Sequence, residues 1–109
     1  MAVTYQKSID AKNGNSIRFL LVNFDYIDGN EYLVKLFVEE YGFIVQEKID
    51  GLWYHIIRVS LGSTIYELLW HEDTGNEIYC INQTEKGNEM LQQRLEKILC
   101  ILNSRMNFS

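Results

Sequence analysis

The chain has 109 residues, of which 47% are hydrophobic and 23% are charged, and its formal net charge is -5 at pH 7. These values are typical of one globular domain that spans residues 1–109, and they exclude intrinsic disorder, which requires few apolar residues. The negative charge disfavours direct nucleic-acid binding, because neutralising phosphates requires clustered Lys and Arg side chains.

The cellular compartment is predicted from two features of the sequence. Residues 1–16 contain no apolar run of signal-peptide length, and no stretch approaches the roughly 20 apolar residues that cross a bilayer. Cys80 and Cys100 are too few for the dense disulfide framework of a small exported domain. We therefore expect a cytoplasmic protein without membrane contact.

The first half of the chain predicts two strands and a helix. Residues 4–9 form a weak edge strand, which a turn joins to a buried strand over residues 16–26 with apolar side chains on both faces. A helix follows, with Asp28 as its N-cap and Gly42 just beyond its end.

The second half predicts four strands and a longer helix that begins after Thr84 as N-cap. The strands cover residues 43–49, 52–61, 64–73 and 77–83, and the helix covers about residues 85–103. The order β-β-α-β-β-β-β-α predicts an α+β fold, in which an antiparallel sheet of about five to six strands carries two helices on one face.

The hairpin turns predict which strand residues share a face. If Asp50-Gly51 and Gly62-Ser63 are two-residue turns, Arg58 lies opposite Glu67. Two arrangements are then open, because two helices cover only one face. Either the helices pack on the face of Glu47, Tyr54, His71 and Cys80, or they pack on the aromatic face. The aromatic face carries Trp53, His55, Ile57, Val59, Tyr66, Leu68, Trp70, Tyr79 and Ile81.

Few residue patterns in the sequence indicate chemistry. Spacings typical of zinc ligands, nucleophile elbows and phosphate loops are lacking, so we expect no metal, no cofactor and no catalytic residue. Acid–base chemistry by His55 and His71 with Glu47 is the remaining enzymatic option. In the predicted register, however, the two histidines point to opposite faces.

Acidic residues are concentrated in the middle of the chain. Residues 59–85 contain acids but no Lys or Arg, and residues 25–40 contain only Lys35 among several acids. A negative surface attracts a basic protein, and exposed aromatic residues often anchor such interfaces. The predicted partner-binding residues are Trp53, Tyr66, Glu67, Trp70, Glu72, Asp73, Glu77 and Tyr79.

In its size, its acidity and the acidic region over residues 67–85, the chain resembles small bacterial immunity proteins, including those of contact-dependent growth inhibition. The resemblance implies a cytoplasmic, non-catalytic protein that binds and neutralises a basic toxin, most plausibly a nuclease domain. Two alternatives stay open. One is a homodimer similar to secretion chaperones, and the other is a small metal-free hydrolase that uses His55 or His71. The sequence leaves both a monomer and a dimer open.

Overall fold

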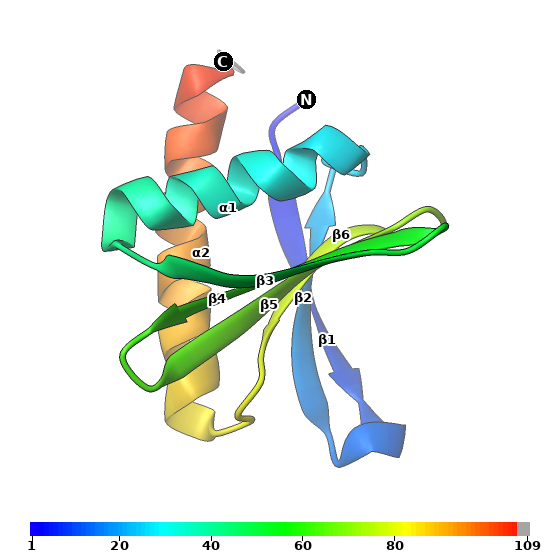
Figure 1. The fold of residues 1–109 in the computed structure, drawn as a ribbon, viewed down its shortest axis with the longest axis vertical. Coiled ribbons are helices and arrows are strands. Elements are labelled where there is room, and N and C mark those ends of the chain that lie inside the picture. The colour runs from blue at the N-terminus through cyan, green and yellow to red at the C-terminus, as the bar shows by residue number, and fades with distance from the viewer. Residues whose placement is uncertain (107–109) are drawn as a thin grey trace.

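The computed structural model describes residues 1–106 and contains one antiparallel sheet and two α-helices (Figure 1). The sheet has six strands in the order β1-β2-β6-β5-β4-β3. The elements are β1 (Thr4–Asp10), a short 3-10 helix (Ala11–Asn13), β2 (Ser16–Val22), α1 (Ile27–Tyr41), β3 (Ile44–Asp50), β4 (Tyr54–Leu61), β5 (Thr64–His71), β6 (Gly75–Cys80) and α2 (Glu85–Arg105). The predicted α+β fold and element order are confirmed.

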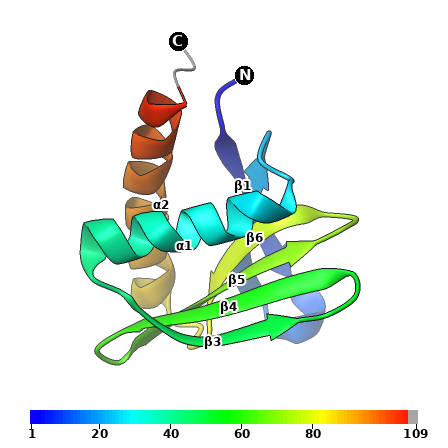
Figure 2. The same ribbon diagram turned by 45° about the horizontal axis from the view of Figure 1, so that its top comes forward.

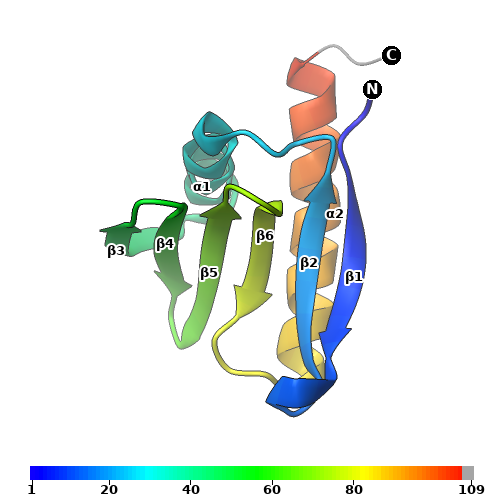
Figure 3. The same cartoon turned by 90° about the vertical axis from the view of Figure 1, so that its right-hand side faces the viewer.

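Both helices lie on the same face of the sheet, and α1 crosses α2 at a steep angle (Figures 1 and 3). Among residues 1–106, no α-helix covers the opposite face. The core therefore lies between the sheet and the helices. Its largest fully buried side chains are Tyr66, Phe19, Phe24, Phe37, Phe43, Leu33, Leu36, Ile57, Leu68, Ile78, Leu91 and Leu95.

The covered face is the one predicted to be aromatic in β4 and β5, so the second of the two predicted arrangements is confirmed for these strands. Tyr79 of β6 was expected on the same face, which is wrong, because it pairs with Glu67 on the opposite face. Ile57, Val59, Tyr66 and Leu68 are all 0% exposed. The expectation that Tyr66 lies on an exposed surface is therefore wrong. The centroids of the Tyr66 and Phe43 rings lie 4.9 Å apart. Tyr66 is buried because this aromatic cluster supplies a large apolar area to the core.

The strand registers agree with the prediction in β4 and β5 and differ at two turns. Arg58 lies opposite Glu67, as predicted. Asp50 pairs with His55, so the β3–β4 connection is longer than the expected two-residue turn. His71 pairs with Gly75, which places Cys80 opposite Tyr66 on the covered face and not beside His71.

The helix ends show which caps the local sequence determines. The Thr84 hydroxyl accepts a hydrogen bond from the Gly87 N–H at 2.9 Å, as expected of an N-cap. Gly42 follows α1 with φ 76°, a left-handed conformation that glycine adopts without strain. The prediction of Asp28 as N-cap is wrong, because α1 begins at Ile27 and places Asp28 in its first turn.

Candidate functional site

Three connections meet at one end of the sheet (Figures 2 and 3). They are residues 23–26, 51–53 and 72–74, which follow β2, β3 and β5. The Glu72 N–H donates to the Trp53 carbonyl oxygen at 3.0 Å, which joins the second connection to the third. Asp25 of the first connection packs against Gly75, the residue that directly follows the third connection and begins β6, where an added Cβ would lie 2.8 Å from the Asp25 Cβ.

We call residues 23–28, 50–53 and 72–74 the acidic end. Its β3–β4 connection exposes large apolar side chains: Leu52 is 82% exposed and Trp53 is 56% exposed. The acidic end also carries four exposed carboxylates that form no ion pair among residues 1–106, namely Asp25, Asp28, Glu72 and Asp73.

Next to the acidic end, His55 lies on the covered face between two carboxylates. Its Nδ1 is 2.6 Å from Asp50 Oδ1, and its Nε2 is 4.0 Å from Glu31 Oε1. His71 belongs to the opposite face, where its Nδ1 accepts a hydrogen bond from the Asp73 N–H at 3.0 Å. The two histidines therefore do not form an acid–base pair around one substrate position.

The uncovered face of the sheet carries two clusters of arginine and carboxylate. Arg58 lies 2.6 Å from Glu67 and 3.1 Å from Glu47, between Nη and carboxylate oxygen atoms. In the second cluster, Arg18 pairs with Glu77, and its guanidinium lies 4.2 Å from the Tyr79 ring centroid. Because these carboxylates already bind arginine, they contribute less negative potential to the surface than those of the acidic end.

The structure separates the predicted partner-binding residues into four places. Trp53, Glu72 and Asp73 belong to the acidic end, and Trp70 lies in β5 next to it. Glu67, Glu77 and Tyr79 lie on the uncovered face, whereas Tyr66 lies in the core. The Trp70 indole Nε1 donates to the Asp25 carbonyl oxygen at 2.9 Å. Trp70 therefore holds the first connection against the sheet.

Sequence reasoning did not assign Leu52, Asp25 and Asp28 to the site. The acidic run over residues 25–40 was a signal for two of them, but their proximity to Asp73 depends on the antiparallel pairing of β2 with β6. The sequence predicts Leu52 as the first residue of a strand. It lies in the β3–β4 connection instead, because Asp50 pairs with His55.

Within residues 1–106, no group of three or more His, Cys, Asp or Glu side chains is arranged to hold a metal ion. Neither described helix is long and apolar enough to cross a membrane. Comparison of the chain with protein-family models, curated proteins and solved structures gave no match. Its function is therefore inferred from the surface itself.

Proposed function

We propose that this protein is a non-catalytic binding protein that recognises a basic protein partner through the acidic end. One observation carries the proposal: Leu52 and Trp53 are exposed on a connection that is hydrogen-bonded to Glu72, at the end of the sheet where four exposed carboxylates form no ion pair among residues 1–106. A tryptophan of this kind provides apolar area that a partner can desolvate. The carboxylates favour encounter with Lys and Arg side chains.

The partner class that we propose is a toxin nuclease domain. A nuclease binds phosphates through Lys and Arg side chains, so its substrate surface is complementary to a cluster of carboxylates beside an apolar anchor. The resemblance to bacterial immunity proteins supports the same class. In this role the protein covers the phosphate-binding surface and performs no reaction of its own.

The test is capture of the partner from the native organism with tagged protein, at low and high salt, followed by mass spectrometry. The variant Glu72→Gln/Asp73→Asn removes two charges from the acidic end. The control Glu85→Gln/Glu89→Gln removes two charges from the start of α2, at the opposite end of β6 (Figure 1). We expect one basic protein at one-to-one stoichiometry, weakened by salt and by the first variant and retained by the control.

The captured protein is then assayed alone for nuclease activity and toxicity. We expect an equimolar amount of the wild-type protein to inhibit both, and the Glu72→Gln/Asp73→Asn variant to inhibit them less. Three results would overturn the proposal: recovery of this chain alone, binding that salt does not weaken, or equal losses from the variant and its control.

A further inference from the structure

A row of mainly apolar side chains crosses the uncovered face of the sheet. Antiparallel pairing places its members opposite one another on neighbouring strands, so they all point to the same face. The row consists of Ile49, Ile56, Leu69, Glu77 and Leu20. Tyr54 and Val22 lie two residues from the row on their own strands and are 39% and 38% exposed. This face therefore presents apolar area that a partner can cover.

The charges on the uncovered face are paired within the chain. Arg58 binds Glu67 and Glu47, and Arg18 binds Glu77. The Glu67 and Glu77 side chains are only 8% and 11% exposed, so covering them adds little to a desolvation cost that folding has already met. These two arginines and three glutamates contribute -1 to the net charge of -5. Two copies of this face therefore repel each other only weakly.

The shape of the sheet favours a copy of itself as the occupant of this face. The sheet is strongly twisted, with β3 lying across the view and β1 and β2 running along its length (Figure 1). A twisted sheet has the form of a saddle, and a saddle that makes half a turn about a line across its strands fits onto its own surface. Two such sheets pack face to face about 10 Å apart, with their strands crossing at about 30°.

The area of the face is sufficient for such a contact. Six strands, spaced about 4.8 Å apart and about 23 Å long, present roughly 600 Å². Two copies together would bury roughly 1,200 Å², which is the lower limit of specific interfaces between proteins.

The arrangement of side chains on this face is also complementary to itself. Half a turn about the row places each of its members over its own copy and exchanges the residues on either side. Arg58 then lies over Tyr54 of the second copy, and Arg18 lies over Val22 of the second copy. A guanidinium group is attracted to an aromatic face, and an arginine stem packs on apolar side chains. Glu77 meets its own copy, but it is already paired with Arg18.

We propose that the uncovered face binds a second copy of the chain, with a two-fold axis along the row of Ile49, Ile56, Leu69 and Leu20. The contact is isologous, because both copies use the same surface. It involves a face other than the acidic end. The dimer can therefore hold if the proposed function fails, and the reverse is also true.

The first test is the mass of the purified chain in solution. Sedimentation velocity from about 1 µM to about 1 mM protein should show a change from one chain to two. Over the same range, the NMR amide signals of Ile56, Leu69 and Leu20 should shift, whereas those of α2 should stay unchanged. A monomer throughout would overturn the proposal. So would shifts confined to β1 or β3, which would place the contact at an edge of the sheet.

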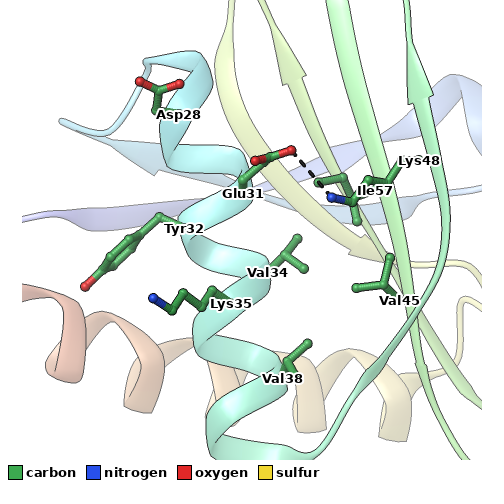
Figure 4. A pocket seen from close by; sticks show the side chains of 9 residues that line it. All are labelled: Asp28, Glu31, Tyr32, Val34, Lys35, Val38, Val45, Lys48 and Ile57. Atoms are coloured by element: carbon green, nitrogen blue, oxygen red, sulfur yellow. Dashed lines mark ion pairs between the residues drawn. The ribbon is translucent and has the colours of Figure 1, made fainter.

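A pair of variants matched in exposure tests the face. Val22→Lys places an ammonium group beside Arg18 of the second copy and should raise the dissociation constant of the dimer about tenfold or more. The control Val38→Lys changes a side chain of α1 that is 37% exposed, beside the groove between this helix and β3 (Figure 4). It should leave the dissociation constant unchanged. Circular dichroism checks that both variants fold, and equal weakening in both would overturn the assignment to this face.

Two changes at Tyr54 test the position of the axis. Tyr54→Lys brings a positive charge to Arg58 of the second copy, whereas Tyr54→Glu brings a negative one. We expect the Glu variant to dimerise about tenfold more tightly than the Lys variant, although it makes the chain more negative, and we expect salt to reduce the difference. The opposite order would overturn the proposed axis. Neither change affects a carboxylate of the acidic end, so partner capture tests the proposed function separately.

Discussion

The two cysteines occupy opposite environments, which limits the chemistry available to the chain. Cys80 is 3% exposed, and its Sγ lies 3.4 Å from the Gly87 carbonyl oxygen. Burial raises the pKa of the Cys80 thiol to about 11. The thiolate is the nucleophilic form of cysteine, so Cys80 is protonated and inert at neutral pH. Cys100 is exposed on α2.

Thiol labelling should therefore distinguish the two cysteines. In folded protein at about pH 8, we expect Cys100 to react rapidly with a chromogenic disulfide reagent and Cys80 to stay unreacted, since its raised pKa keeps the thiolate scarce below about pH 11. Cys100→Ser should abolish the rapid phase, whereas Cys80→Ser should keep it. Mass spectrometry of labelled peptides checks the assignment, and rapid labelling of Cys80 in folded protein would contradict it.

At the scale of the strands, the chemistry of facing side chains predicted the strand register better than the expected turn lengths did. The opposite charges of Arg58 and Glu67 supported a register that the structure confirms. The face on which each β6 side chain lies depends on the length of the turn over residues 72–74, because one residue more or less in a turn moves every following side chain to the other face. Cys80 therefore lies on the covered face, and no local signal in the turn determines this.

The two helix starts show the same limit. Thr84 caps α2 through its own side chain, so its role could be predicted from neighbouring residues. The start of α1 depends on contacts far away in the chain. The Asn76 side-chain amide donates to the carbonyl oxygens of Phe24 and Tyr26, both at 3.0 Å, and so fixes the connection that precedes the helix. Local capping rules contain no information about this contact.

The pairing of β4 with β5 should depend on Glu67 far more than on Glu47, although both bind Arg58. The Glu67 side chain is 8% exposed, whereas that of Glu47 is 50% exposed. We expect Glu67→Gln to lower the free energy of unfolding by about 1–3 kcal/mol, because it weakens a buried charge-assisted hydrogen bond. The matched variant Glu47→Gln should cost less than about 0.5 kcal/mol. Urea unfolding measures both, and equal effects would contradict this role for Glu67.

At the scale of the whole molecule, antiparallel pairing collects distant residues at one end of the sheet. Glu72 and Asp73 are neighbours in sequence, so their clustering could be predicted directly. Asp25 and Trp53 reach the same place only because β2, β3 and β5 all finish at this end. The order of strands in the sheet, which the sequence did not determine, therefore assembles the candidate site.

This assembly predicts different kinetic roles for the charged and apolar parts of the acidic end. With the captured partner, Asp25→Asn/Asp28→Asn should lower the association rate constant severalfold at low salt and change the dissociation rate constant little, because unpaired surface charges act mainly on diffusional encounter. The difference from wild type should fade as salt shortens the screening length to about 8 Å and below. Trp53→Ala should instead raise the dissociation rate constant about tenfold or more, because it removes a desolvated contact. Stopped-flow binding over a range of ionic strengths measures both constants. Charge variants that slow association equally at low and high salt would contradict electrostatic attraction as the role of these carboxylates.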